Sequence, residues 1–512
     1  MTEQPFGTKT TGRTGGADVD VEALTWRPLG RRTPVFEGLD LAIPAGQRVL
    51  LVGPSGSGKS TLLRAVAGLL LTSSHGDLSG RVRVEGTDVQ DSAPRVGLLL
   101  QDPRAAVVAE TVGRDVAFGL ENRRVPRDAI WPRVEAALAT SRFPYGVGHL
   151  TGALSGGESQ RLALAGSLVL DNPVLLLDEP TSMLDDLAAD SVRCAVMREV
   201  QRLRCTTVIV EHHLEPWVDF VDRVVVLSSA GRIVADGPAS EVMEGQGRAL
   251  AEQGVWVPGL PSPEPAAVDL DLVAPWALGP GGLVTATNVR VELRAAVRTP
   301  RTAPTVALDG VDASLTAGRV LAVTGPSGAG KSTLVAALAG LVRPTSGTIR
   351  AHRDLAPRQR DEPWRWSAPD LTARLAWVAQ VPEHAIVTGT VLDEVLLSGQ
   401  SCKRDRAWLQ VRAVGLLELF GLSHLTAASP YHLSGGEQRR LMVAAALVHG
   451  PRGLLLDEPT VGQDRLTWAA VVGAMNAARD AGSGVSVSTH DRRAVRALAD
   501  DEIVLADGRR AC

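Results

Sequence analysis

The stretch RVLLVGPSGSGKSTLLRAVAGLL, from Arg48 to Leu70, decides the fold of the chain's first half. Its apolar start predicts a buried strand over 49–52, and the run from Ser60 to Leu70 predicts a helix. The loop between them has the form GxxxxGK[ST], which aims backbone N–H groups and the positive end of a helix at one anion. The loop is therefore predicted to bind phosphate.

The same pattern returns in the second half of the chain. GPSGSGKST at 53–61 recurs as GPSGAGKST at 325–333, LSGGE at 154–158 recurs at 433–437, and LLLDEPT at 175–181 recurs at 454–460. The last two pairs lie 279 residues apart, but the phosphate loops lie 272 apart, so the second half holds about seven extra residues. The polar stretch 352–374, which contains Trp364 and Trp366, is predicted to be this insertion, on the surface.

The repeat predicts two domains of the α/β class, each with a mainly parallel sheet. Half one is predicted over 19–254 and half two over 283–512, after a flexible tail at 1–18. Residues 255–282, which include PGLPSPEP, have the composition of an extended linker. No run reaches the ~18 apolar residues of a membrane span, and the tail lacks the pattern of a secretion signal. These observations predict a cytoplasmic protein.

Composition argues against several classes of function. With 53 basic and 57 acidic residues the net charge is −4, which gives no support for nucleic acid as a partner. The four cysteines show no CxxC pairing, so a zinc site or disulfide framework is not expected.

Each half also carries candidate catalytic residues. Asp178 and Glu179 follow an apolar strand, where a metal-binding aspartate and a water-polarising glutamate are expected, and Asp457 and Glu458 repeat the pair. His212 and His490 each follow another apolar strand, from which an imidazole can reach a γ-phosphate. His213 has no counterpart, since Asp491 stands at that place, and it is expected at the surface. LSGGE begins a second helix with an anion-binding N-terminus, although a plainly capped helix explains it equally well.

Together these motifs resemble the nucleotide-binding domains of the ATP-binding-cassette (ABC) superfamily. The resemblance implies two P-loop ATPase domains that each add a helical subdomain, and it implies ATP and Mg²⁺ as cofactors. It makes Gln101 and Gln380 the Q-loop glutamines and has the D-loops end at Asp185 and Asp464. It also predicts catalytic roles for Gln101, Glu179, His212, Gln380, Glu458 and His490. The implied Mg²⁺ ligands are Ser60, Gln101, Asp178, Ser332, Gln380 and Asp457.

In this superfamily two domains dimerise head to tail, so each ATP lies between one domain's phosphate loop and the other's LSGGE. The fused chain is therefore expected to form its own dimer. The predicted nucleotide-binding residues are Gly53, Pro54, Ser55, Gly56, Ser57, Gly58, Lys59, Ser60 and Thr61 with Ser434, Gly435 and Gly436, and Gly325, Pro326, Ser327, Gly328, Ala329, Gly330, Lys331, Ser332 and Thr333 with Ser155, Gly156 and Gly157.

The segment 101–122 is similar to the Q-loop region of energy-coupling-factor importer ATPases. This resemblance implies a transmembrane coupling subunit and a substrate-binding membrane subunit, with the chain on the inner face of the membrane, and a vitamin, vitamin precursor or metal ion as cargo. The alternative is a tandem ABC ATPase that acts in translation or resistance without membrane partners. The family's adenine-stacking aromatic could be Trp26 in half one, whereas NVRVELRAAV in half two has none.

Overall fold

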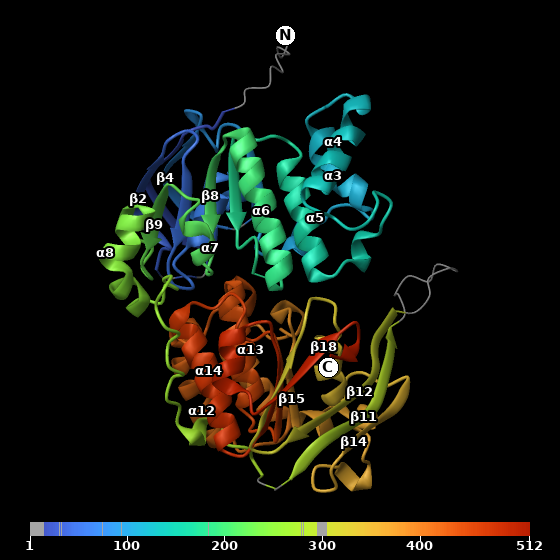
Figure 1. Cartoon of the computed structure of the whole chain (residues 1–512). Helices are drawn as coiled ribbons and strands as arrows, with labels where there is room; N and C mark the ends of the chain where they lie inside the picture. The colour runs from blue at the N-terminus through green and yellow to red at the C-terminus, as the bar shows by residue number, and fades with distance from the viewer. Residues whose placement is uncertain are drawn as a thin grey trace, which may run out of the picture.

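The computed structural model describes residues 15–29, 31, 33–73, 75–93, 95–182, 184–277, 279, 281–293 and 305–511. Two halves of the same architecture lie one above the other, with the N-terminal half in blue to green and the C-terminal half in yellow to red (Figure 1). Within the described ranges, no helix combines the length and the apolar character needed to cross a membrane.

The centre of each half is a six-stranded sheet with the same strand order. In half one it is β10-β9-β3-β8-β7-β6, parallel except for β10 (Ile233–Pro238). In half two it is β15-β16-β17-β13-β18-β19, parallel except for β19 (Arg509–Arg510). The parallel strands are β3 (Arg48–Val52), β6 (Val96–Leu99), β7 (Val174–Asp178), β8 (Thr206–Val210) and β9 (Arg223–Leu227), and β13 (Val320–Thr324), β15 (Leu375–Val378), β16 (Gly453–Asp457), β17 (Gly484–Ser488) and β18 (Asp501–Ala506). The predicted α/β class, with its mainly parallel sheets, is confirmed.

A second, antiparallel sheet covers one face of each central sheet. Its strands are β1 (Val19–Pro28), β2 (Phe36–Ile43), β4 (Gly76–Val84) and β5 (Thr87–Asp88) in half one, and β11 (Gly282–Leu293), β12 (Thr305–Thr316) and β14 (Ser346–Ala351) in half two. The central strands are apolar throughout because both of their faces are buried. On β3, Val49 and Leu51 pack toward the antiparallel sheet, whereas Leu50 and Val52 pack toward the helices.

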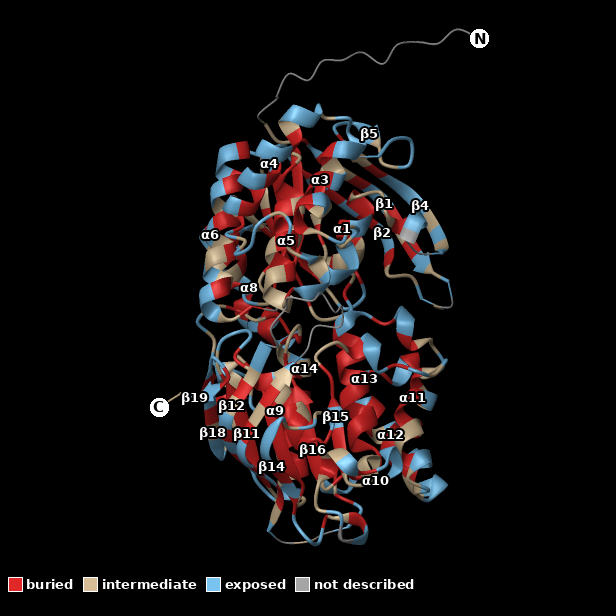
Figure 2. Cartoon of the chain, turned by 90° about the vertical axis from the view of Figure 1, so that its right-hand side faces the viewer, coloured by how far each residue is buried: buried red, intermediate tan, exposed pale blue. Residues whose placement is uncertain are grey.

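Helices complete the two halves. Those of half one are α1 (Lys59–Val66), α2 (Leu70–Ser73), α3 (Val112–Asn122), α4 (Arg127–Thr140), α5 (Gly156–Leu168), α6 (Asp186–Leu203), α7 (Glu215–Val218) and α8 (Ala239–Glu252). Those of half two are α9 (Lys331–Leu338), α10 (Ala368–Thr372), α11 (Val391–Ser401), α12 (Arg406–Leu419), α13 (Gly435–Leu447), α14 (Arg465–Asp480) and α15 (Arg492–Leu498). Helices α3, α4 and α5 share a core of their own, which is the helical subdomain of half one. Buried residues concentrate in the sheets and the helix faces against them (Figure 2).

Three segments differ from their sequence-based expectations. Of the predicted tail, residues 1–14 lie outside the described range, but Ala17 is buried and its oxygen accepts a hydrogen bond from Thr206 Oγ1. The stretch 352–374 is not simply a surface insertion, because Trp366 is buried in a cluster with Leu355. The linker runs along half two, where Val273 is buried in the core that contains α12, α13 and α14.

Candidate functional site

The phosphate loops leave the carboxyl ends of β3 and β13 and lead into α1 and α9. Gly53 has φ +154°, and a Cβ atom there would lie 2.4 Å from the Leu227 oxygen. Gly325 repeats this, with φ +135° and a contact of 2.1 Å to the Leu505 oxygen. Only glycine fits both the backbone angle and the close approach, which explains the first residue of each motif.

The lysine of each loop folds back onto its own backbone. Lys59 Nζ donates to the oxygens of Gly53 and Pro54 at 2.8 and 2.9 Å, and Lys331 repeats both bonds at 2.9 and 3.0 Å. Burial lowers the pKa of Lys59, against the pull of Glu179, Asp464 and Asp178. No side chain caps α1 or α9. The uncapped N–H groups and the lysine ammonium therefore surround a space suited to phosphate.

Two buried hydroxyls also fit a phosphate ligand. Ser55 Oγ and Ser57 Oγ make no hydrogen bond among the residues that the structure describes. Buried polar atoms without partners are rare in folded proteins, and they often mark a place where a ligand or water binds. Both hydroxyls belong to the loop that the sequence predicts to hold ATP.

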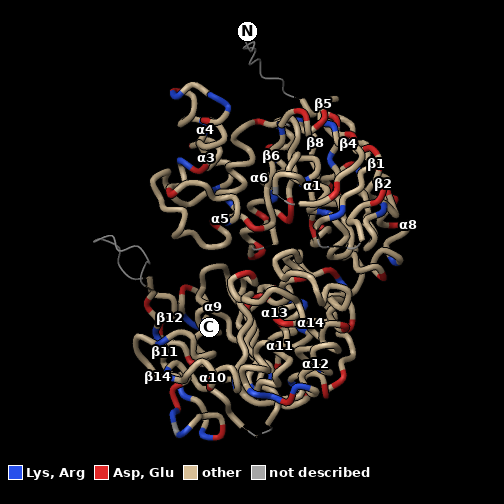
Figure 3. The backbone as a smooth tube through the Cα atoms, turned by 180° about the vertical axis from the view of Figure 1, so that it is seen from behind, with Lys and Arg blue, Asp and Glu red and all other residues tan. Residues whose placement is uncertain are grey.

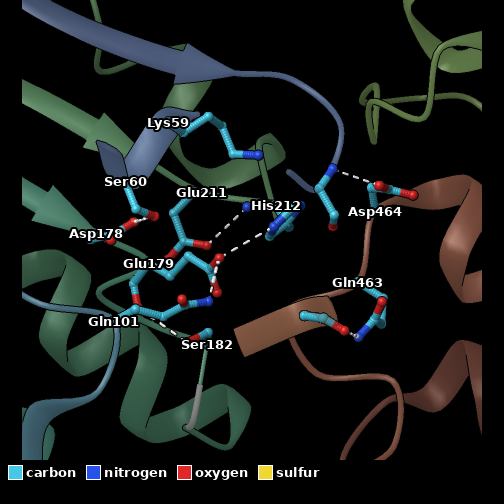
Figure 4. A network of polar contacts seen from close by, with 12 residues as sticks. Lys59, Ser60, Gln101, Asp178, Glu179, Ser182, Glu211, His212, Gln463 and Asp464 are labelled. Carbon is cyan, nitrogen blue, oxygen red and sulfur yellow. Dashed lines mark hydrogen bonds and ion pairs between the residues drawn. The ribbon is translucent and has the colours of Figure 1, made fainter. Parts of the chain in front are cut away.

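The acidic pair of half one lies at the end of β7, beside the phosphate loop (Figure 4). Ser60 Oγ donates to Asp178 Oδ1 at 3.0 Å, so the hydroxyl and carboxylate expected to hold Mg²⁺ are adjacent. Burial and the neighbouring Glu179 raise the pKa of Asp178 to about 6. Oxygen donors of this kind suit Mg²⁺, which needs few protein ligands because it keeps several waters.

Glu179 lies at the centre of a polar network. Its Oε1 accepts a hydrogen bond from Gln101 Nε2 at 2.9 Å and lies 3.3 Å from His212 Nε2. Burial alone would raise its pKa, but His212, Lys59 and Gln101 together hold the pKa down at about 2. Its second oxygen, Oε2, is buried and without a partner among the described residues. Glu179 is therefore an ionised carboxylate with one free oxygen facing the site.

Half two repeats the arrangement with small changes. Ser332 hydrogen-bonds to Asp457, which also accepts from Ser488 Oγ, and burial raises the pKa of Asp457. His490 reaches Glu458 Oε1 through Nδ1, at 3.0 Å, where His212 uses Nε2. Burial acts to lower the pKa of His490, but Glu458 raises it above its ordinary value.

The LSGGE segments begin helices α5 and α13 with complete capping boxes. Ser155 and Ser434 each accept from the N–H of the glutamate three residues on, and that glutamate accepts from the serine's own N–H. The capping box uses the backbone N–H groups of the serine and the glutamate, but it leaves the glycine N–H groups at the helix start available to an anion.

Contacts between the halves bring each phosphate loop to the aspartate that ends the opposite half's D-loop. Asp464 Oδ2 accepts from the Ser55 N–H at 2.6 Å, and Asp185 Oδ2 accepts from the Ser327 N–H at 2.8 Å. Residues 53–61 with residues 434–436 and Asp464 are called site one below. Residues 325–333 with residues 155–157 and Asp185 are called site two. The aspartates thus arrange the halves head to tail.

One functional candidate escaped the sequence analysis. Glu211 is 3% exposed, and its carboxylate accepts from Thr181 N and Oγ1 and from the His212 N–H. Burial and Glu179 raise its pKa to about 7. Thr489 stands at this place in half two, where Thr460 Oγ1 has no partner among the described residues. The sequence did offer one indication of Glu211: it is an acidic residue directly after an apolar strand, and half two has no acidic residue at the matching position.

The structure also bears on the expected adenine-stacking aromatic and on the expected exposure of His213. Trp26 is 2% exposed in the core between the sheets of half one, so the prediction that it stacks on adenine is not supported. The matching stretch of half two is described only to Leu293, so its remainder lies outside the described residues. His213 is exposed, as expected.

Comparison with known proteins identifies the family. Residues 36–182 and 308–461 match the family model described as ABC transporter. The chain belongs to the ABC transporter family. It is an ABC transporter ATPase with two cassettes, and these are the ATP-binding domains.

Similar proteins cover nearly the whole chain. It is 32% identical over 502 residues to "Putative HMP/thiamine import ATP-binding protein YkoD" of Bacillus subtilis, covering 95% of this chain and 89% of that protein. It is 33% identical over 528 residues to "Putative ABC transporter ATP-binding protein SCO2324" of Streptomyces coelicolor, covering 94% and 90%. The solved complex of archaeal ribosomal stalk protein aP1 and archaeal ribosome recycling factor aABCE1 matches with TM-score 0.55 and 21% identity, over 95% of this chain and 89% of that one. At that identity the likeness shows the fold alone.

Proposed function

We propose that the chain hydrolyses ATP at both composite sites to drive an energy-coupling-factor importer for a vitamin, a vitamin precursor or a metal ion. The observation that carries the proposal is the near full-length similarity to a protein named for HMP/thiamine import. Support from the structure is that each half supplies a phosphate loop, a lysine, an acidic pair and a histidine to the two sites.

The residues of each site have separate tasks in this proposal. Lys59 and Lys331 exchange their own backbone oxygens for the β- and γ-phosphates, and the glycine N–H groups of the opposite half contact the γ-phosphate. Ser60 and Asp178, or Ser332 and Asp457, would hold Mg²⁺, with Gln101 and Gln380 as further ligands, and the ion would neutralise charge on the phosphates. Because a carboxylate of pKa about 2 is a weak base, Glu179 orients and polarises the attacking water.

Both halves offer an equivalent surface to membrane subunits. Val108 and Val387 follow the Q-loop glutamines, are 57% and 70% exposed, and stand at the common offset, since 387 − 108 = 279. Two related apolar positions suit a partner that contacts both halves at once, as a transmembrane coupling subunit beside a substrate-binding subunit would. The chain then works at the inner face of the membrane through these partners.

The alternative, a translation or resistance factor, has less support. The chain's similarity to an archaeal ribosome recycling factor shows the fold alone. Acidic and basic residues are interspersed over both halves (Figure 3), where an RNA-binding face calls for a concentration of basic residues.

Uptake and co-purification test the proposal together. Cells that lack the chain should lose uptake of labelled thiamine, HMP or cobalt, and the wild-type chain should restore it while a Lys59→Ala/Lys331→Ala variant should not. The tagged chain should bring a small polytopic protein out of detergent extract. Recovery of ribosomes, with uptake unaffected by the deletion, would overturn the importer proposal.

A further inference from the structure

The chain crosses from half one to half two directly after α8, and this crossing touches site one. Gly254 accepts from the Arg465 N–H at 2.9 Å. Gly254 has φ +98°, and a Cβ atom there would lie 3.4 Å from the Asp464 carboxylate. Two residues later, Trp256 Nε1 donates to the Gln463 oxygen at 3.0 Å. The crossing therefore hydrogen-bonds to the two residues that flank Asp464, and Gly254 lies beside the Asp464 carboxylate.

The Trp256 ring is fixed by three side chains of half two. The guanidinium of Arg493 lies 4.6 Å from the ring centre and that of Arg465 lies 5.9 Å from it. Trp468 packs edge-on against the ring at 5.8 Å and donates its own Nε1–H to Asp491, beside His490. Cation–π contacts of this kind contribute roughly 0.5–2 kcal/mol each. Trp256 is thus held firmly in half two although it directly follows half one.

The residue that Trp256 binds connects two parts of site one. Gln463 Nε2 donates to the Gly436 oxygen at 3.3 Å, and Gln463 Oε1 accepts from Arg440 at 3.1 Å. The next residue, Asp464, accepts from the Ser55 N–H of the phosphate loop. Figure 4 shows Gln463 and Asp464 facing the site from half two. A shift of Gln463 would therefore move Gly436 and Asp464, which half two supplies to site one.

Site two is built differently at the matching positions. Leu184 stands where half two has Gln463, and a leucine side chain makes no hydrogen bond to the LSGGE backbone. A Cβ atom at Gly56 of site one would lie 3.3 Å from Glu437 Oε1, whereas one at Gly328 of site two has nothing within 4 Å. The phosphate loop is thus in close contact with the opposite half at site one and more open at site two.

We propose that Trp256 is a positioning residue for ATP turnover at site one, which holds Gln463 and Asp464 of half two against the phosphate loop of half one. Site two lacks this support among the residues that the structure describes. The two sites therefore turn over unequally, although both carry a full set of catalytic groups. This inference rests on the composite sites of the proposed function.

The test measures ATP hydrolysis by the full chain with one site disabled at a time. In a Lys331→Ala background, which leaves site one, Trp256→Ala should lower kcat about tenfold or more while KM changes little, since small displacements of a site cost that much and the phosphate contacts of Lys59 and Ser60 remain. In a Lys59→Ala background, which leaves site two, the same substitution should change kcat less than about twofold. Trp256→Phe, which keeps an aromatic ring but loses the indole N–H that bonds to Gln463, should lower kcat by an intermediate amount.

Trp276→Ala is the matched control, because Trp276 is another linker tryptophan that packs against half two, edge-on to Trp408 and against Arg404, away from both sites. It should leave both backgrounds unchanged. Hydrogen exchange gives a readout free of activity: Trp256→Ala should speed exchange of the Ser55 amide and not that of Ser327.

An equal loss at both sites, no loss at site one, or the same loss from Trp276→Ala would overturn the assignment of Trp256. Hydrolysis that survives in the Lys59→Ala/Lys331→Ala double variant would instead overturn the composite sites themselves.

Discussion

Replacing either D-loop aspartate with asparagine should break one contact between the halves and nothing else. In each aspartate, one carboxylate oxygen caps a helix and the other accepts a hydrogen bond from the opposite half. Asp464 Oδ1 accepts from the Thr467 N–H and caps α14, while Oδ2 accepts from Ser55. Asp185 caps α6 through the Ala188 N–H and accepts from Ser327. Asparagine caps helices as well as aspartate does, but its amide would present a donor to the N–H of the phosphate loop.

The expected magnitude follows from the burial of each contact. A hydrogen bond to a charged group contributes about 1.5–3 kcal/mol, and each 1.4 kcal/mol changes an equilibrium tenfold. Asp464 is 3% exposed, so Asp464→Asn should weaken the contact at site one by about a hundredfold. Asp185 is more exposed, and solvent competes for its bond, so Asp185→Asn should weaken site two by about tenfold.

Amide hydrogen exchange, read by mass spectrometry on peptides spanning residues 53–58 and 325–330, reports each contact directly. Asp464→Asn should speed exchange at Ser55 and leave Ser327 unchanged, and Asp185→Asn should do the reverse, so each variant controls for the other. Unchanged exchange at Ser55 in Asp464→Asn would refute the reasoning, as would equal loss of protection at both loops. The melting temperature should stay near that of wild type, because both caps remain.

Three further predictions address the catalytic groups and the core. Glu179→Gln and Glu458→Gln should each slow hydrolysis at their own site by roughly 10²–10⁴-fold while ATP binding survives, and either should stall uptake; normal uptake with only one of them would show that the sites have unequal roles. Because burial raises the pKa of Glu211 to about 7, the native carboxyl holds a proton between pH 5 and 7 that the unfolded chain has released. The unfolding free energy of wild type should therefore fall relative to that of Glu211→Gln as pH rises from 5 to 7. Urea unfolding midpoints of both proteins at pH 5 and pH 7 check the sign. Arg412, 2% exposed, donates to the Val448 and Leu447 oxygens at the end of the LSGGE helix and to the Asp271 oxygen in the linker. Because Arg412→Met leaves these buried acceptors without a donor, it should destabilise half two by about 1–3 kcal/mol in a thermal melt, whereas the exposed Arg406→Met should change little.

Much of the site could be predicted from the sequence because its chemistry is local. A phosphate loop is made by consecutive residues, so the glycines and lysine of residues 53–61 are recognisable without a fold. Glu211 was missed for the opposite reason. Its partner Thr181 lies 30 residues away, in the turn after β7, whereas Glu211 directly follows β8, and only the sheet that pairs β7 with β8 brings them together. Trp26 was misjudged because distance along a strand does not reveal which side chains face the core.

By itself the sequence determined two cassettes, their α/β class and the residues that surround phosphate, since these depend on short motifs and their repetition. Only the tertiary structure decided which contacts join the two halves. Ser55 and Asp464 are 409 residues apart, and no local preference links an N–H in one loop to a carboxylate in the other. The contacts of Trp256 also depend on the tertiary structure, because the sequence predicts only that this residue belongs to an extended linker. Its role exists only because packing places this part of the linker against the D-loop of half two, where one hydrogen bond and two guanidinium groups fix it.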